Sequence, residues 1–91
     1  MRRGPVYRVI LHRYADKDYR GFDAKLKAKT DRALNDIRLS PYHGPNIKKL
    51  KGKLSNLYRY RIGGFRILYE IVEDKKTVRV KTIEARGKIY K

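Results

Sequence analysis

Apolar and polar residues alternate near the start of the chain, and the spacing of apolar residues then widens. Tyr7, Val9 and Leu11 recur at every second position within residues 6–11, which are rich in β-branched side chains. A period of two predicts a β-strand with one buried face. A short polar helix is predicted next, over residues 14–19.

After Gly21, which interrupts that first helix, the spacing becomes that of an amphipathic helix. Five apolar residues fall near one stripe between residues 22 and 39: Phe22, Leu26, Ala33, Leu34 and Ile37. Pro41 disfavours helical backbone at Ser40, the residue before it. The second helix is therefore expected to stop at Ser40.

Three strands separated by tight turns are predicted in the second half, over residues 57–62, 65–73 and 77–85. The Gly63-Gly64 pair supplies the positive φ angles that a two-residue hairpin turn needs. A second turn, at Asp74-Lys75, aligns the last strand. The first turn fixes the register of the first two strands: Ile62 faces Phe65, Tyr60 faces Ile67, and Tyr58 faces Tyr69.

This register divides the side chains of the three strands between two faces. One face is apolar and aromatic, and the second helix should cover it: Tyr58, Tyr60, Ile62, Phe65, Ile67, Tyr69, Ile71, Val78 and Val80. The other face holds Arg59, Arg61, Arg66, Glu70, Arg79 and Lys81, with Leu57, Leu68, Val72 and Ile83 among them. We therefore predict one α+β domain over residues 1–91. It consists of an N-terminal strand, a helical hairpin and a three-stranded antiparallel β-meander, with the helices packed on one face of an antiparallel sheet.

The charge balance points to a polyanionic partner. Lys and Arg number 25 and Asp and Glu number 9, which gives the 91 residues a formal net charge of +16. Hydrophobic residues still make up 41% of the chain, so a folded core is expected rather than a disordered basic tail. A folded domain with this charge favours binding to nucleic acid, to an acidic protein, or to both.

Composition also excludes several kinds of site. The chain has no cysteine, which excludes a disulfide scaffold and a thiolate zinc site. His12 and His43 are far apart in the sequence and form no metal-binding motif, so neither a metal nor a cofactor is predicted. No apolar run reaches the roughly 18 residues of a membrane span. The basic N-terminus lacks the apolar core of a signal peptide, so a cytoplasmic protein is expected.

The basic face contains an arrangement that folding alone does not favour. Arg61 is expected directly opposite Arg66, and like charges that face each other across strands are destabilising. We interpret the pair as part of an anion site; the alternative is a solvated face whose charges serve solubility. Four lysines of a predicted basic linker are further candidate phosphate contacts, or else form a solvated loop: Lys48, Lys49, Lys51 and Lys53.

Three segments of the sequence resemble the RelE/ParE toxin superfamily. They are Lys49-Leu50-Lys51-Gly52, the run YRYRIGGFRILYEI from Tyr58 to Ile71, and Arg86-Gly87-Lys88-Ile89-Tyr90. The resemblance implies a compact toxin with the element order predicted above. RelE-type members are ribosome-dependent endoribonucleases that cut mRNA in the A site, whereas ParE-type members poison DNA gyrase. A small antitoxin that wraps the toxin neutralises both types.

The resemblance also implies site residues, because RelE members place basic residues on the middle strands and near the C-terminus, together with a late tyrosine. The corresponding candidates for catalysis here are Arg59, Arg61, Arg66, Arg86 and Tyr90. Well-known members have lysines where Arg59 and Arg61 stand, and arginine cannot serve as a ready general base. The identity of the base therefore stays open. Glu70 is conceivable, although opposite Arg79 it is alternatively a cross-strand ion pair.

From the residues and the resemblance together, we expect the toxin component of a toxin–antitoxin system. It would be a metal-independent endoribonuclease that cleaves mRNA on the ribosome and inhibits translation, with Arg79 and Lys81 joining the four lysines as RNA or ribosome contacts. The expected partners are an acidic RelB-like antitoxin, the ribosome and mRNA. The toxin is expected to be a monomer alone and part of a hetero-oligomer with its antitoxin. Two alternatives stay open: a ParE-like gyrase inhibitor that cleaves no RNA, and a non-toxic basic nucleic-acid-binding domain.

Overall fold

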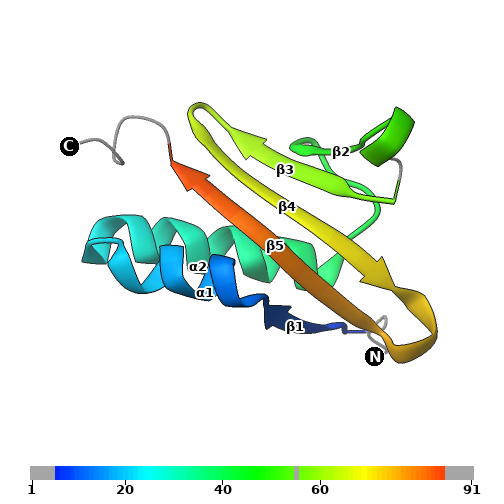
Figure 1. Cartoon of the computed structure of the whole chain (residues 1–91), viewed down its shortest axis with the longest axis horizontal. Helices are drawn as coiled ribbons and strands as arrows, with labels where there is room; N and C mark the ends of the chain where they lie inside the picture. Colours follow the sequence, from blue (N-terminus) through cyan, green and yellow to red (C-terminus); the bar gives the residue numbers. More distant parts are fainter. Residues whose placement is uncertain (1–5, 55, 86–91) are drawn as a thin grey trace, which may run out of the picture.

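Two α-helices cover one face of a five-stranded β-sheet in the computed structural model, which describes residues 6–54 and 56–85 (Figure 1). In chain order the elements are β1 (Arg8–Leu11), α1 (Arg13–Gly21), α2 (Ala24–Leu39), β2 (Ile47–Lys49), the 3₁₀ turn η1 (Gly52–Leu54), β3 (Tyr58–Ile62), β4 (Phe65–Val72), the 3₁₀ turn η2 (Glu73–Lys75) and β5 (Thr77–Ala85). The predicted strand, helical hairpin and meander occur in the expected order, so the α+β class is confirmed.

The sheet is larger than the predicted meander, and it is mixed. Its strand order is β1-β5-β4-β3-β2, in which β1 runs parallel to β5 and the other neighbours are antiparallel. The expectation of an antiparallel sheet is therefore wrong at β1, because the helices provide the long crossover that parallel pairing needs. The linker assigned to Lys48–Lys53 is wrong in part, since Lys48 and Lys49 belong to β2. Three residues are too few for β2 to show an alternation in the sequence.

Side-chain caps begin both helices. Nδ1 of His12 accepts a hydrogen bond from the backbone N–H of Tyr14 (3.3 Å), and Oδ1 of Asp23 accepts one from that of Leu26 (2.8 Å). These bonds satisfy N–H groups that have no partner within the first helical turn. At its other end, α2 stops before Pro41, as predicted.

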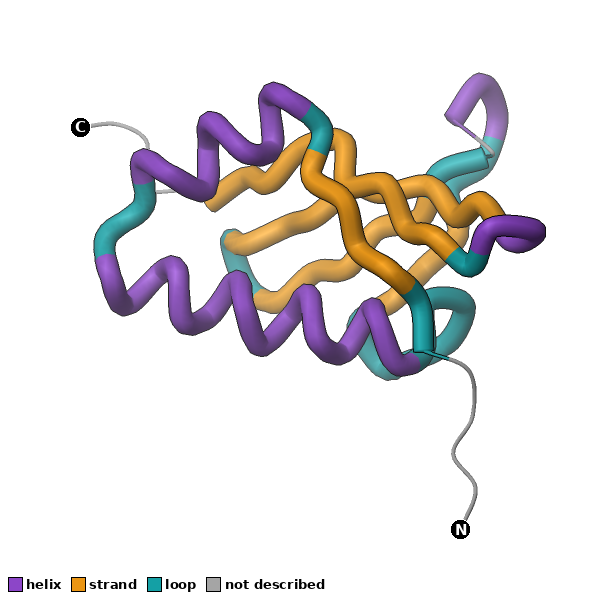
Figure 2. Tube along the Cα trace, turned by 90° about the horizontal axis from the view of Figure 1, so that it is seen from below, coloured by secondary structure: helices purple, strands orange, loops and turns teal. Residues whose placement is uncertain are grey.

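Helix α2 runs alongside the sheet (Figure 2), and its buried residues belong to the same hydrophobic core as the apolar residues of the meander. Leu26, Ala33 and Ile37 are buried as predicted, and the other two residues of the predicted stripe pack against the core. The strands contribute the buried residues Tyr60, Phe65, Ile67, Tyr69, Val78 and Val80. Thr30 is not part of the predicted apolar stripe, yet it is fully buried. Its burial is tolerated because its hydroxyl donates a hydrogen bond to the carbonyl of Leu26 (2.8 Å).

The predicted register of the β3–β4 hairpin is confirmed at every pair. Ile62 lies opposite Phe65, Tyr60 opposite Ile67, and Tyr58 opposite Tyr69. Gly63 has a φ of 57°, as the two-residue turn requires. One residue of the predicted apolar face, Ile62, stays 41% exposed at the tip of the hairpin.

A β-bulge alters the register between β4 and β5. Leu68 lies opposite Thr82 but Tyr69 lies opposite Val80, so Lys81 has no opposite residue. Side-chain alternation reverses after this extra residue, and Ile83 is consequently buried on the helix side of the sheet. The prediction that Ile83 lies on the basic face is therefore wrong.

The carboxylate of Glu73, in the turn between β4 and β5, bonds to side chains from other parts of the chain. Oε1 of Glu73 accepts hydrogen bonds from the hydroxyls of Tyr7 (2.7 Å) and Tyr42 (2.9 Å), and Oε2 pairs with Lys76. The Lys76 contact and then the tyrosine hydroxyls lower the pKa of Glu73 from 4.5 to about 2. Burial and the bond to Glu73 raise the pKa of Tyr42 to about 12. Tyr7, the residue before β1, and the loop after α2 are thus both attached to this turn.

Glu73→Gln is expected to destabilise the fold at neutral pH and to have a smaller effect in acid. A carboxyl group with a lowered pKa in the folded state stabilises the fold above its unfolded pKa. That stabilisation disappears as the pH falls from about 4.5 towards 2. Urea unfolding, followed by circular dichroism at neutral and at acid pH, measures the difference between wild type and variant. A difference that stays constant on acidification would contradict the role given to Glu73.

Candidate nucleic-acid interface

Basic side chains from three neighbouring strands meet on the sheet face that the helices leave open. Strand β3 contributes Arg59 and Arg61, β4 contributes Arg66, and β2 contributes Lys48. Tyr60, between the two arginines of β3, is buried on the helix side, so the alternation of a strand directs its neighbours to the opposite face. Lys48 lies opposite Arg59, and Arg61 lies opposite Arg66 as predicted. We call these four residues the outer-face cluster.

Arg59 lies in a row that crosses the sheet from Lys48 through Leu68 to Thr82. Its Nε is buried and has no hydrogen-bond partner in residues 6–54 and 56–85, and the same holds for the hydroxyl of Thr82. Leaving a buried polar group without a partner costs free energy. A phosphate oxygen at this row would supply the acceptor that the guanidinium lacks.

Arg66 is paired with a carboxylate that the predicted register did not assign to this face. Nε and Nη2 of Arg66 both donate to Oε1 of Glu84, the opposite residue on β5, with Nε at 3.0 Å. The two side chains are 43% and 48% exposed. This ion pair offsets part of the electrostatic repulsion between Arg61 and Arg66. The same repulsion is the reason for interpreting their pairing as part of an anion site.

The sequence does contain a signal for the placement of Glu84. The apolar residues of β5 are Val78, Val80, Ile83 and Ala85, and they recur at intervals of two except for the interval of three between Val80 and Ile83. An interval of three within an alternating strand is what one bulged residue produces. Reading that interval as a bulge would have placed both Glu84 and Thr82 on the outer face.

Glu70 pairs with the basic residues of β5 rather than with the outer-face cluster. It lies opposite Arg79, as predicted, at 4.0 Å between Oε2 and Nη1, and its Oε1 is 3.3 Å from Nζ of Lys81. The ion-pair interpretation of Glu70 is therefore confirmed. Part of the charge of Arg79 and Lys81 is balanced locally, and their contact with RNA stays a prediction.

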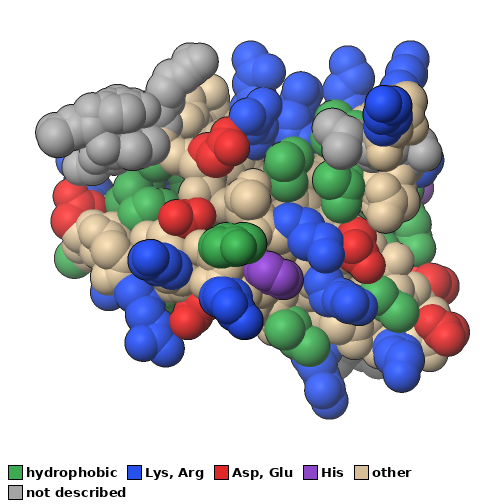
Figure 3. Space-filling view, viewed as in Figure 1, with side chains coloured by type: hydrophobic (Ala, Val, Ile, Leu, Met, Phe, Trp, Pro, Cys, Tyr) green, Lys and Arg blue, Asp and Glu red, His purple; other side chains and the backbone are tan. Residues whose placement is uncertain are grey.

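The four lysines of the predicted linker do not share one face. Lys48 is on the outer face, whereas Nζ of Lys49 lies 5.3 Å from the ring centre of Tyr58, on the side of the sheet that carries the helices. Lys51 and Lys53 are exposed between β2 and β3. Figure 3 shows Lys and Arg side chains crowded along the edge of the molecule where β2 and β3 lie. Arg86 and Tyr90, the remaining predicted site residues, lie outside the described residues.

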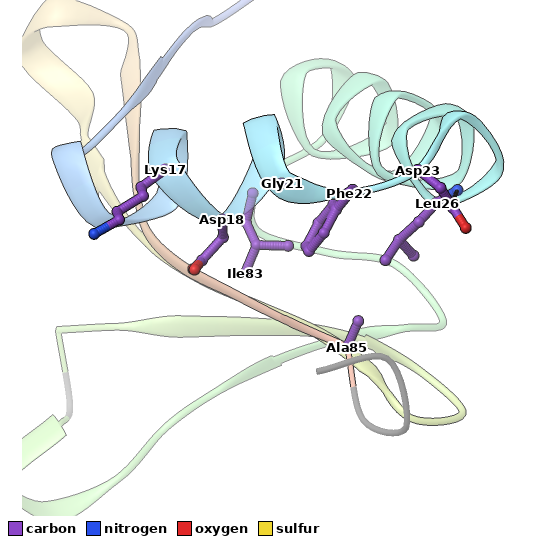
Figure 4. Close-up of a pocket in the computed structure, with 8 residues that line it drawn as sticks. All are labelled: Lys17, Asp18, Gly21, Phe22, Asp23, Leu26, Ile83 and Ala85. Atoms are coloured by element: carbon purple, nitrogen blue, oxygen red, sulfur yellow. Dashed lines mark hydrogen bonds between the residues drawn. The ribbon is translucent and has the colours of Figure 1, made fainter. Parts of the chain in front are cut away.

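A cavity of about 450 Å³ opens between the helical hairpin and the end of β5, on the helix side of the sheet (Figure 4). Its apolar wall comes from Phe22, Leu26, Ile83 and Ala85. Lys17, Asp18, Gly21 and Asp23 complete the lining. Because Ile83 and Ala85 face away from the arginines, this cavity is separate from the outer-face cluster.

No described helix is long and apolar enough to cross a membrane, and no group of three His, Asp or Glu among the described residues could hold a metal ion.

Solved toxins of toxin–antitoxin systems share the fold. The structure is similar to the RelBE2 toxin–antitoxin complex of Mycobacterium tuberculosis, with a TM-score of 0.79, 24% identity and coverage of 91% of this chain and 94% of the matched chain. The isolated RelE toxin of E. coli matches with a TM-score of 0.74 and 24% identity, over 92% of this chain and 90% of its own. At this identity the likeness establishes the fold.

Sequence comparison gives the family. The RelE1 protein of Methanocaldococcus jannaschii is 28% identical over 87 residues, which cover 93% of this chain and 96% of that protein. The family described as "ParE toxin of type II toxin-antitoxin system, parDE" matches residues 9–90. That match includes the hairpin with the three cluster arginines and extends to the C-terminal segment. The chain therefore belongs to the ParE toxin family of type II toxin–antitoxin systems, within the RelE/ParE superfamily.

Proposed function

We propose that this toxin is an endoribonuclease that cleaves mRNA on the ribosome and thereby inhibits translation. The observation that carries the proposal is the outer-face cluster: Lys48, Arg59, Arg61 and Arg66 gather across three strands. The buried Nε of Arg59 lacks an acceptor in the described part of the chain. A surface of this kind suits a phosphodiester backbone better than a neutral ligand.

The chemistry of RNA cleavage makes separate demands on such a site. The 2′-hydroxyl must lie in line with the leaving oxygen, charge on the phosphorane must be stabilised, and protons must be transferred. Arg61 and Arg66 are suited to the second task, because guanidinium groups match phosphate oxygens. Arg86 and Tyr90 stay predictions as a further phosphate contact and as a stacking or proton-donating group. Binding on the ribosome would supply the in-line orientation, which can lower a barrier by several kcal/mol.

The proposed partners of this toxin are the ribosome with its mRNA and an acidic antitoxin. Among the solved neighbours, the E. coli RelE toxin has been crystallised with its antitoxin RelB. An acidic antitoxin would neutralise part of the formal charge of +16 and would cover the same cations that contact RNA. We propose a monomeric toxin that acts in the cytoplasm and forms a hetero-oligomer with the antitoxin.

A ParE-like inhibitor of DNA gyrase is the second candidate, and the family match favours it. In that case the outer-face cluster would bind a protein or DNA surface, and no phosphodiester bond of mRNA would break. The two candidates share the fold, so the discrimination depends on chemistry rather than on structure.

Induction of the chain in a bacterium separates these candidates. We expect growth to stop and mRNA 5′ ends to accumulate inside translated codons, because cleavage requires mRNA held by the ribosome. Sequencing of 5′ ends, together with plasmid supercoiling, measures both outcomes. Intact mRNA with altered supercoiling would overturn the nuclease in favour of the gyrase inhibitor. Normal growth at confirmed expression of folded protein would contradict both.

A further inference from the structure

The proposed reaction needs a group that takes the proton of the attacking 2′-hydroxyl, and the arginines of the outer-face cluster cannot do this at neutral pH. A carboxylate on the same face is the natural candidate. The strands place two there, Glu70 and Glu84. The other acidic residues belong to the helices, the helix caps or the turn after β4. Among the carboxylates of Asp and Glu, the choice of base is therefore between these two residues.

The surroundings of the two carboxylates differ. Both oxygens of Glu70 face a cation, Lys81 at 3.3 Å and Arg79 at 4.0 Å, and its side chain is 23% exposed. The Glu84 side chain is 48% exposed, and both hydrogen bonds from Arg66 end on Oε1. Within residues 6–54 and 56–85, the hydrogen bonds to Glu84 end on Oε1 alone, which leaves Oε2 for a substrate, whereas each oxygen of Glu70 faces a cation.

We propose that Glu84 is the general base of this toxin, an assignment that rests on the proposed endoribonuclease function. Arg66 would have two roles. Its Nε and Nη2 hold the carboxylate of Glu84 in place, and its Nη1, which bonds to no other described residue, would contact a phosphate oxygen. Arg61, directly opposite Arg66, adds a second guanidinium beside the same phosphate. A base fixed by a third group next to the phosphate-binding cations is the arrangement that 2′-hydroxyl attack needs.

The step balances without an added reactant. The 2′-hydroxyl proton passes to Oε2 of Glu84 while the 2′-oxygen forms a bond to phosphorus. The bond from phosphorus to the 5′-oxygen breaks, and water donates the proton that this leaving oxygen takes up. The products are a 2′,3′-cyclic phosphate and a 5′-hydroxyl end, and Glu84 returns its proton to solvent.

A different role for Glu84 predicts the opposite result. If the carboxylate only neutralises Arg66, it competes with phosphate for the guanidinium. Its removal would then strengthen RNA binding and leave cleavage as fast as before, or faster. If Glu84 is the base, its removal slows the chemical step even when the substrate is fully bound.

The test is Glu84→Gln, which keeps the size of the side chain and an oxygen for Arg66 but cannot take the proton. Single-turnover cleavage is measured on purified ribosomes carrying a defined mRNA, with toxin at saturation, and binding is measured separately. We expect the cleavage rate to fall by at least about 100-fold, with binding unchanged or tighter. Glu84→Asp, which keeps a carboxylate, should retain an intermediate rate.

Asp74→Asn is the matched control, because it removes the same charge from an exposed turn at the far end of the β4–β5 hairpin. It should cleave at the rate of the wild type. A folded Glu84→Gln protein that cleaves as fast as this control, or faster, would overturn the assignment and leave the nuclease itself standing. If wild type and control both leave the mRNA intact, the proposed function fails and the assignment of Glu84 fails with it.

Discussion

Arg61→Ala is expected to lower the rate of mRNA cleavage about 1,000-fold, the upper end of what one lost transition-state donor costs. The side chain is exposed on the outer face, opposite Arg66, and no carboxylate in the described part of the chain pairs with it. Arg66 already shares its charge with Glu84. Arg61 is therefore the cation of this pair whose full charge can act on the phosphorane. Single-turnover cleavage on programmed ribosomes measures the loss.

Two comparisons make this result specific to the position. Arg13→Ala removes an arginine of equal charge from an exposed site on α1, on the helix side of the sheet, and should cleave at the wild-type rate. Arg61→Ala should also reduce the slope of log affinity against log salt by about 0.7, the contribution of one phosphate contact on a single strand. Equal cleavage by the two variants would remove Arg61 from the site. An unchanged salt slope would remove it from phosphate contact.

The sequence was sufficient for the features that depend on neighbouring residues. The Gly63-Gly64 turn and the alternation of the flanking strands both act locally, and together they determine that Arg61 lies opposite Arg66. The end of α2 follows from Pro41, which also acts locally. The turn and the strand alternation together position three of the four residues in the outer-face cluster.

The features that the sequence did not predict depend on long-range pairing. The parallel position of β1 beside β5 and the addition of β2 to β3 involve backbone hydrogen bonds between distant segments. The alternation in β1 predicts a strand but not its partner, and the three residues of β2 are too few to show an alternation. The bulge at Lys81 was not predicted either, although the interval of three between Val80 and Ile83 indicates it. It matters most for function, because it places Glu84 beside Arg66 and so changes the electrostatics of the candidate site.

The two proposed activities, RNA cleavage and gyrase inhibition, are both compatible with this core, because the proposed binding surface is the outer face of the sheet. The buried residues of β3, β4 and β5 point to the helices, and their alternating partners form the outer face. Substitution on the outer face can therefore change the bound polyanion or the reaction without altering the packing. Substitutions on the outer face can therefore test the choice between RNA cleavage and gyrase inhibition. The positions for this test are Arg59, Arg66 and Glu84.

Ile67→Ala is expected to destabilise the domain by about 3 kcal/mol and to lower its melting temperature by about 12–24 °C. Ile67 is fully buried in the middle of β4, between Tyr60 of β3 and Ile83 of β5. Removing its side chain beyond Cβ leaves a cavity at the centre of the sheet, which the neighbouring strands cannot close without moving. A domain with a net stability of about 5–15 kcal/mol would lose a large part of it. Thermal and urea unfolding measure the change.

Ile62→Ala is the matched control, because it makes the same substitution on the same hairpin at a side chain that is 41% exposed. Its cost is expected to stay below about 1 kcal/mol, since little apolar surface returns to water there. Both variants keep every residue of the outer-face cluster, so folded Ile67→Ala protein at low temperature should cleave RNA at the wild-type rate. Equal destabilisation by the two substitutions would contradict the packing described for β4. Loss of cleavage in folded Ile67→Ala would show that the outer face depends on the core more closely than the alternation of the strands implies.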